Sequence, residues 1–197
     1  PVSSYIREGA LSTIPLEGKP LFAIYAYEWG GLDPGNGDPL GYLDGELSNN
    51  WSAIMNSVTI EDINYIGPIR PTKFGALRNN FTYKGLNLSF NISYRLGYYF
   101  RRPSVNYNNV YTGLGTHGDY HFRWQNPGDE LRTQVPSMPE TRNIQRDNFY
   151  NLSEALVERG DHIRFQDINV SYVFEKGDFP RLPVQRVQLY TYVNNIG

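Results

Sequence analysis

The segment at residues 122–130, FRWQNPGDE, brings together side chains that can bind a polar ligand. Two aromatic rings stand beside a guanidinium, two amides and two carboxylates, and such a set can stack on and hydrogen-bond a hydroxylated molecule. Its members are Phe122, Arg123, Trp124, Gln125, Asn126, Asp129 and Glu130. An Asn-Pro-Gly turn with an aromatic anchor also fixes long loops in place. The architectural role is favoured, and a ligand-contact or partner-contact loop is the alternative.

Two other clusters contain residue types that can bind metal ions. His117, Asp119 and His121 lie close together in THGDYHF, but no second cluster supports metal binding, so they are expected to be loop residues. The stretch 33–45, DPGNGDPLGYLDG, lacks the ligand spacing of a calcium loop and its closing Glu, so a series of turns is expected. No paired-carboxylate, Ser-His-Asp or phosphate-binding set stands out. The sequence predicts neither an enzyme nor a metal or cofactor site.

Composition narrows the class of protein. The chain has 197 residues, 15% aromatic residues, 19 Gly and 13 Pro, which favours an all-β fold with many turns. A net charge of −2 gives no basic surface for nucleic acid. There is no run of 18 apolar residues for a transmembrane helix, whereas membrane strands alternate and are compatible with the mean hydropathy of −0.52.

Five strands are expected, and their connections alternate between short and long. The strands are 20–29, 75–83, 86–99, 162–174 and 184–195. Lys84-Gly85 joins the second to the third, and about nine residues join the fourth to the fifth, whereas the other connections have about 45 and 62 residues. In outer-membrane barrels short turns face the periplasm and long loops face outside. The spacing therefore predicts an antiparallel transmembrane β-barrel segment with long extracellular loops and short periplasmic turns.

The third strand, LNLSFNISYRLGY (86–98), alternates throughout between apolar residues and polar or small ones. At about 3.3 Å per residue it spans about 43 Å, and a tilt of about 40° leaves enough length to cross an apolar band about 25 Å tall. The residues expected to face lipid are Leu86, Leu88, Phe90, Ile92, Tyr94, Leu96, Ile168, Val170 and Tyr172. Those expected to face a hydrated lumen are Asn87, Ser89, Asn91, Ser93 and Arg95. A soluble β-sandwich also alternates and remains the alternative.

Four ordered segments are more specific than this alternation. They are GKPLFAIYAYEWGGLDPGNGDPLGYLDG (18–45), GPIRPTKFGALRNNFTYKGLNLSFNISYRLGYYFRR (67–102), FRWQNPGDELRTQVP (122–136) and ERGDHIRFQDINVSYVF (158–174). Together they resemble the C-terminal part of SusC/RagA-like TonB-dependent outer-membrane transporters, and the closing LYTYVNNIG is similar to the penultimate-strand ending of that family.

The resemblance implies a barrel of 22 strands, about five of them within residues 1–197, in the cell outer membrane of a Bacteroidetes-like Gram-negative bacterium. It implies a plug domain that contacts TonB, a SusD-like surface lipoprotein as partner, contact with membrane lipid, and import of oligosaccharides or peptides. The plug and the final strand are expected outside residues 1–197, which would supply barrel wall and outer loops. The alternative function is a secreted or surface glycan-binding β-sandwich without transport, and the sequence does not choose between glycan and peptide.

Overall fold

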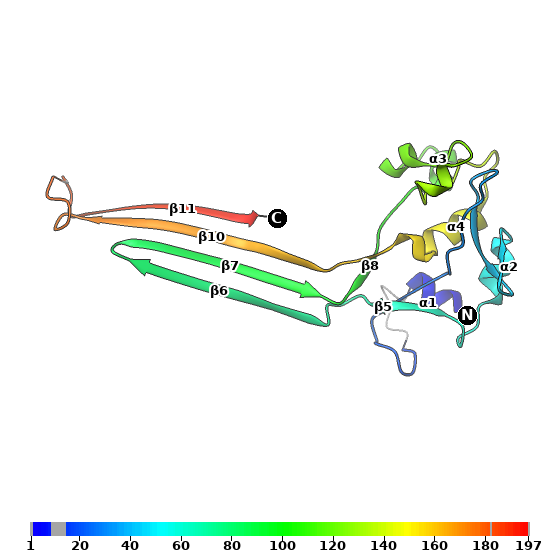
Figure 1. Ribbon diagram of the computed structural model, residues 1–197, viewed down its shortest axis with the longest axis horizontal. Coiled ribbons are helices and arrows are strands. Elements are labelled where there is room, and N and C mark those ends of the chain that lie inside the picture. Colours follow the sequence, from blue (N-terminus) through cyan, green and yellow to red (C-terminus); the bar gives the residue numbers. More distant parts are fainter. Residues whose placement is uncertain (1, 9–14, 182, 197) are drawn as a thin grey trace. The chain divides into compact units, whose positions relative to one another are not determined.

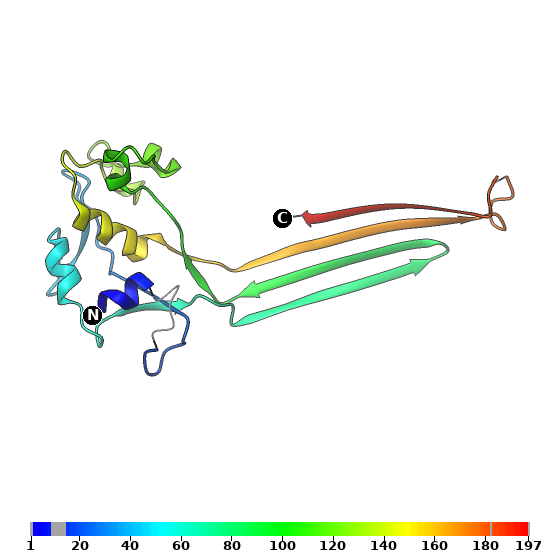
Figure 2. The ribbon, with the colours of Figure 1, turned by 180° about the vertical axis from the view of Figure 1, so that it is seen from behind.

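The computed structural model describes residues 2–8, 15–181 and 183–196. The chain divides into two compact units, one made of Pro1–Arg70 with Tyr99–Arg159 and the other of Pro71–Tyr98 with Gly160–Gly197 (Figure 1). Each unit therefore combines two segments that are far apart in the sequence, as the colours of the reverse view also show (Figure 2).

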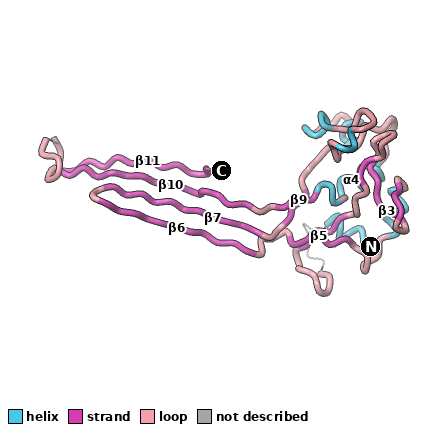
Figure 3. The backbone as a smooth tube through the Cα atoms, in the orientation of Figure 1, coloured by secondary structure: helices cyan, strands magenta, loops and turns pink. Residues whose placement is uncertain are grey.

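The second unit is a four-stranded antiparallel sheet (Figure 3). Its strands are β6 (Lys73–Tyr83), β7 (Leu86–Leu96), β10 (His162–Glu175) and β11 (Arg186–Ile196), in the order β11-β10-β7-β6. Lys84 and Gly85 join β6 to β7 with φ angles of 42° and 81°, the positive values that a tight two-residue hairpin turn requires. Four long expected strands are thereby confirmed, with small shifts at their ends.

Strand register gives this sheet two chemically different faces. Leu88 lies opposite Phe81 on β6 and Val170 on β10, whereas the next residue, Ser89, lies opposite Asn80 and Asn169. Directly opposite residues share a face, so the alternation of β7 continues across its neighbours. We call the two sides the apolar face and the polar face. The apolar face carries Leu77, Phe81, Leu86, Leu88, Phe90, Ile92, Tyr94, Leu96, Ile163, Phe165, Ile168, Val170, Tyr172, Leu189 and Val193.

Side-chain contacts follow this division. On the apolar face the ring of Phe90 lies 6.1 Å from that of Phe81 and 6.4 Å from that of Phe165, measured between centroids. On the polar face Thr82 donates a hydrogen bond to Asn87, and the Asn91 amide donates to Asp167 at 3.4 Å. The second unit is a single sheet, whereas a β-sandwich requires a second sheet over the apolar face.

A β-bulge in β10 keeps its apolar residues on one side. Phe165 lies opposite Ile92 and Asp167 lies opposite Asn91, so Gln166 is an extra residue without a partner of its own on β7. The amide of Gln166 instead donates to the hydroxyl of Ser93 at 2.6 Å. The two adjacent polar residues of the sequence are thus accommodated without turning the rest of the strand over.

The first unit contains short strands, helices and two hydrophobic clusters. Its strands are β1 (Ala23–Ala26), β2 (Gly31–Leu32), β3 (Pro39–Leu43), β4 (Glu46–Ser48), β5 (Asn64–Pro68), β8 (Tyr99–Arg101) and β9 (Val157–Arg159). Its helices are α1 (Val2–Glu8), α2 (Trp51–Ser57), α3 (Tyr107–Tyr111) and α4 (Ile144–Leu152), with 3-10 turns η1 (Gly118–Phe122), η2 (Asp129–Leu131) and η3 (Glu154–Leu156). No helix among the described residues is long and apolar enough to span a membrane.

Asparagines start three of these helices. The side chains of Asn50, Asn106 and Asn143 each accept a hydrogen bond from a backbone N–H in the first turn of α2, α3 and α4. The helices then contribute to two hydrophobic clusters. One cluster is Ile6, Ala23, Tyr25, Tyr27, Ile54, Ile63 and Phe149, and the other is Val105, Tyr107, Val135, Tyr150 and Leu156.

One strand expected in this unit was wrong, and the C-terminal end of one strand of the second unit differs from the expectation. The expected strand at 20–29 is only the four-residue β1, which is buried at every position and pairs with β5. Four consecutive buried residues suit a small core rather than a membrane strand, which needs about 9–11 residues. The expected strand 86–99 ends at Leu96, because Gly97 has φ of 73° and β8 begins two residues later. The long connections are therefore folded and packed, although their composition indicated only loops and turns.

Candidate functional site: the cavity beside residues 122–130

Trp124 anchors residues 122–130, the segment predicted as a ligand-contact or partner-contact loop, which we call the contact loop. Its side chain is 7% exposed, its backbone N–H donates to the carbonyl of Val135 at 2.9 Å, and its indole Nε1–H donates to Glu130 Oε2 at 3.1 Å. The backbone N–H of Gly128 donates to the same carboxylate oxygen at 2.8 Å. The indole is thereby fixed in a hydrogen-bonded, largely buried position.

The two carboxylates of the loop are used to shape it. Hydrogen bonds from the backbone N–H groups of Asn126 and Gln125, 2.9 and 3.0 Å long, lower the pKa of Asp129. The pKa of Glu130 is lowered by its own backbone N–H and then by the Trp124 indole. Both groups are therefore ionised at neutral pH while they accept these hydrogen bonds. This geometry supports the architectural role for Trp124, Asp129 and Glu130.

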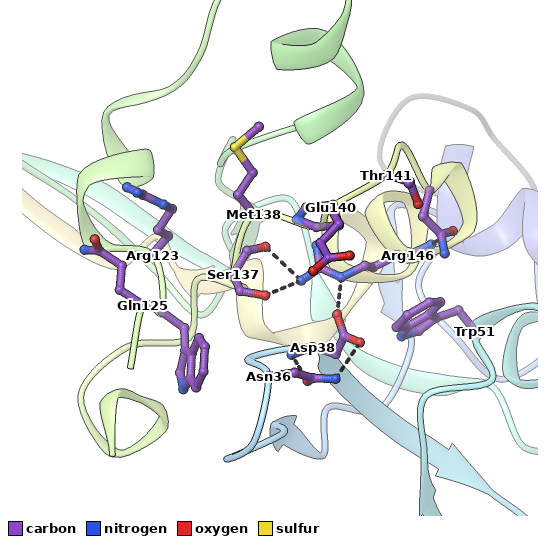
Figure 4. A pocket seen from close by; sticks show the side chains of 13 residues that line it. Asn36, Asp38, Trp51, Arg123, Gln125, Ser137, Met138, Glu140, Thr141 and Arg146 are labelled. Atoms are coloured by element: carbon purple, nitrogen blue, oxygen red, sulfur yellow. Dashed lines mark hydrogen bonds and ion pairs between the residues drawn. The ribbon is translucent and has the colours of Figure 1, made fainter. Parts of the chain in front are cut away.

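A cavity of about 690 Å³ lies against this loop (Figure 4). The loop contributes Arg123, Trp124 and Gln125 to its lining, and the side chains of Arg123 and Gln125 are seen on one side of it. The opposite wall comes from the 33–38 turn, from α2 and from the segment that leads into α4. These walls supply Asn36, Asp38, Trp51, Ser137, Met138, Pro139, Glu140, Thr141, Asn143 and Arg146.

Arg146 holds the floor of the cavity together. Its side chain is 2% exposed, and Nε donates to Asp38 Oδ1 at 2.6 Å. Its Nη2 donates to the carbonyl and the hydroxyl of Ser137, at 2.8 and 3.1 Å. A guanidinium at the start of α4 thus joins two loops that are about 100 residues apart in sequence, because a buried cation needs an opposite charge and hydrogen-bond acceptors. The ion pair organises this site and leaves few donors of Arg146 for a ligand.

Gly37 allows the 33–38 turn to approach the contact loop. Its φ is 72°, and a Cβ at this position would lie 2.5 Å from carbon atoms of the Trp124 ring. The turn is closed by the N–H of Gly37, which donates to the Asp33 carbonyl at 2.8 Å, and by Gly35 N–H, which donates to the Asp33 side chain at 2.7 Å. The expected turn is found at residues 33–38, where these hydrogen bonds close it, whereas residues 39–43 of the expected series of turns form strand β3.

The predicted contact residues are therefore divided between two roles. Arg123 and Gln125 line the cavity, and Arg123 also lies over the ring of Tyr120, 4.1 Å from its centroid. Phe122 is 71% exposed and contributes to a separate, smaller cavity of about 240 Å³, while Asn126 serves the turn. Sequence reasoning missed Asp38 and Arg146. Their pairing has no local signal, because it depends on a tertiary contact.

Asp119 belongs to a polar network with Arg102 and Ser104. It accepts hydrogen bonds from Arg102 and from the hydroxyl of Ser104, the latter at 2.6 Å. Partial burial opposes its ionisation, but these two hydrogen bonds and the Arg102 charge lower the pKa of Asp119. Tyr150 Oη lies 2.9 Å from the Ser104 hydroxyl, and burial raises the pKa of Tyr150 to about 12. Among the described residues no group of three metal-ligating side chains is found.

The fold is shared with part of an importer of known structure. The chain aligns with the RagAB peptide importer in the open-open state at a TM-score of 0.57 and 18% identity, covering 88% of this chain and 18% of that chain. The RagAB peptide transporter aligns at a TM-score of 0.55 and 19% identity, covering 88% of this chain and 18% of that chain. The RagAB peptide importer in the closed-closed state aligns at a TM-score of 0.53 and 19% identity, covering 88% of this chain and 19% of that chain. This chain thus spans less than a fifth of the solved chains. No family model and no curated protein sequence matches it.

Proposed function

We propose that these residues form barrel wall and outer loops of a longer TonB-dependent outer-membrane importer of the SusC/RagA kind. The observation that carries the proposal is the two-faced sheet of four long strands, in a chain that shares its fold with part of RagAB structures. Strands of 11–14 residues are long enough to cross the apolar part of a bilayer when tilted.

The apolar face is the part of the sheet assigned to lipid. Leu77 is 58% exposed, Phe81 56% and Leu189 62%, and these side chains lie on one face of two different strands, β6 and β11. Contiguous exposed apolar surface of this kind marks contact with a membrane or another protein. We assign lipid to the whole length of this face, because its apolar residues continue without interruption from Leu86 to Leu96.

The polar face is assigned to a hydrated lumen. Asn87, Ser89, Asn91, Ser93 and Arg95 lie on it together with polar residues of β6 and β10. In this topology the Lys84-Gly85 turn and the β10–β11 connection face the periplasm, and the two long connections face outside the cell. The barrel would be completed by strands from outside residues 1–197.

The cavity beside residues 122–130 is proposed to contact cargo or a SusD-like lipoprotein partner from the outer side. It offers charges of both signs from Arg123 and Glu140, together with the indole of Trp51 and the amide of Gln125. Such groups can bind either a peptide or an oligosaccharide. The peptide cargo of RagAB favours peptides as the first class to test. TonB is proposed to act through a plug supplied elsewhere in the full chain.

Uptake by cells tests this function. The full-length chain containing these residues is deleted in its host, and accumulation of labelled oligopeptides and oligosaccharides is compared with that in cells carrying the restored gene. The proposal predicts that deletion abolishes uptake of one cargo class and that restoration requires TonB. A full-length chain that stays in the soluble fraction, or a deletion that leaves uptake of both cargo classes unchanged, would contradict it.

A further inference from the structure

Three arginines lie near one another on the polar face of the second unit, and we call them the arginine cluster. Arg95 and Ser93 are successive residues of this face on β7, and Arg164 of β10 lies opposite Ser93. Arg78 of β6 lies opposite Asn91, the next residue of the same face along β7. Neighbouring strands are about 4.8 Å apart and successive residues of one face about 6.8 Å apart, so the Cα atom of Arg164 is about 8 Å from that of Arg95 and about 12 Å from that of Arg78. The long side chains of all three can therefore reach one small ligand.

The three guanidinium groups are available to such a ligand. All three residues are exposed, and among the described residues no hydrogen bond or ion pair joins their guanidinium groups to another side chain. His162 lies opposite Arg95 and can only add positive charge. One carboxylate, that of Asp167, lies on the same face opposite Asn91, whose amide donates to it at 3.4 Å. Three cations and one carboxylate leave an excess of positive charge, which attracts an anion.

This excess is confined to one half of the polar face. Toward the hairpin turn, β7 and β10 carry uncharged polar side chains, which are Ser89, Asn87, Asn169 and Ser171. Beyond them Glu175 lies directly opposite Arg186 of β11, so these two charges offset each other. The arginine cluster thus lies in the half of the sheet that is farther from the two turns. In the proposed topology this is the outer half of the lumen wall, which cargo from outside the cell reaches first.

We propose that the arginine cluster binds the carboxylates of acidic peptide cargo as the cargo enters the lumen. A guanidinium can form two parallel hydrogen bonds with a carboxylate. In an extended peptide, side chains two residues apart lie on one side and are about 6.8 Å apart, so alternate Glu side chains can contact Arg164 and Arg78 at the same time. Phe74, which is 74% exposed opposite Arg95, adds an apolar contact for a neighbouring side chain. The inference rests on the proposed function, because a barrel lumen is what brings cargo to this face, and RagAB favours peptides as its source of carboxylates.

Peptide binding by the purified full-length chain tests the inference. Two pentapeptides with blocked termini, Ala-Glu-Ala-Glu-Ala and Ala-Gln-Ala-Gln-Ala, differ only in charge, and their affinities are measured by isothermal titration calorimetry. The wild type is expected to bind the acidic peptide about tenfold more tightly, which corresponds to about 1.4 kcal/mol. The triple variant R78Q/R95Q/R164Q should bind the two peptides equally, with an unchanged affinity for the Gln peptide. Arg186→Gln removes the same charge from the same face outside the arginine cluster and should retain the preference.

The salt dependence and a single variant support the test if the triple variant folds poorly. The preference should shrink when salt is raised from about 0.05 M to about 0.5 M, because exposed charges are screened. Arg164→Gln alone should reduce the preference by about threefold, whereas Arg186→Gln should not reduce it. Equal effects of these two single variants would contradict a site at the arginine cluster.

The outcomes separate this inference from the proposed function. Equal affinity of the wild type for the two peptides, or a preference that persists in the triple variant, would overturn the arginine site and leave the importer standing. Equal weakening of both peptides by the triple variant would assign the arginines to contacts with another part of the full chain and would also overturn it. Binding of an oligogalacturonate, but of neither peptide, would overturn the acidic-peptide ligand. A full-length chain that is absent from the outer membrane would overturn the proposed function together with this inference.

Discussion

Replacing Phe90 by Arg places a charge near the middle of the apolar face. Phe90 is four residues from Leu86, about 13 Å along the strand and about 10 Å along the membrane normal at a tilt of about 40°. A cation this close to the midplane costs about 2–4 kcal/mol. The two aromatic contacts of Phe90 contribute about 0.5–1.5 kcal/mol each, so their loss brings the expected destabilisation to about 3–7 kcal/mol.

The neighbouring Ser89 supplies the matched control. Its side chain lies on the polar face opposite Asn80 and Asn169, so Ser89→Arg puts the same charge into water at a cost within about 1 kcal/mol. Both full-length variants are measured by their amount in the outer-membrane fraction and by the urea concentration that unfolds the heat-resistant form. Phe90→Ala separates the aromatic loss from the charge. Equal abundance and equal urea resistance of Phe90→Arg and Ser89→Arg would refute the lipid assignment.

Three further changes test the local geometry. Gly37→Ala should destabilise its turn by about 1–3 kcal/mol, because it combines a positive φ with a clash against an indole, whereas Gly45→Ala meets open space and should cost only about 1 kcal/mol; hydrogen exchange at residues 122–137 measures the difference. Deleting Gln166 should be tolerated, because it removes the bulge residue and preserves the register between β10 and β7. Deleting Ser89 moves the side chains of one half of β7 to the opposite face of the sheet and should prevent assembly in the outer membrane. The pKa of Asp119 is lower in the folded than in the unfolded chain, so its stabilising contribution is complete above the unfolded pKa and disappears as pH falls through the lower folded pKa. When pH is lowered from 7 to 3, Asp119→Asn should therefore lose less hydrogen-exchange protection around η1 than the wild type. Equal losses in the two proteins would contradict this.

The long strands of the second unit were predictable because their information is local. From Leu86 to Leu96 the apolar or polar type of each residue indicates the face of the sheet on which it lies. Lys84-Gly85 indicates the hairpin without reference to the rest of the chain. The bulge at Gln166 also has a local signal, since two adjacent polar residues stand between two alternating segments. A hydrophobic pattern with a period of two residues is sufficient to predict a strand wherever that strand has one apolar side.

The first unit was not predictable in the same way. Its helices are five to nine residues long, too short for a clear helical period, and its strands are shorter still. The cavity depends on a contact between Arg146 and Asp38, and no local sequence pattern predicts a contact between residues so far apart in sequence. The contact loop was recognised by composition, but the separation of its anchors from the cavity-lining Arg123 and Gln125 required coordinates.

Single cysteines along β7 test the central claim most directly, since residues 1–197 contain none. A spin label is attached in turn at positions 87–92 of the full-length chain in lipid bilayers, and its collisions with lipid-soluble oxygen and a water-soluble nickel chelate are compared. The account predicts oxygen-accessible labels at 88, 90 and 92 and chelate-accessible labels at 87, 89 and 91. Chelate access at every position, or accessibility without a period of two residues, would contradict a strand that separates lipid from a hydrated lumen.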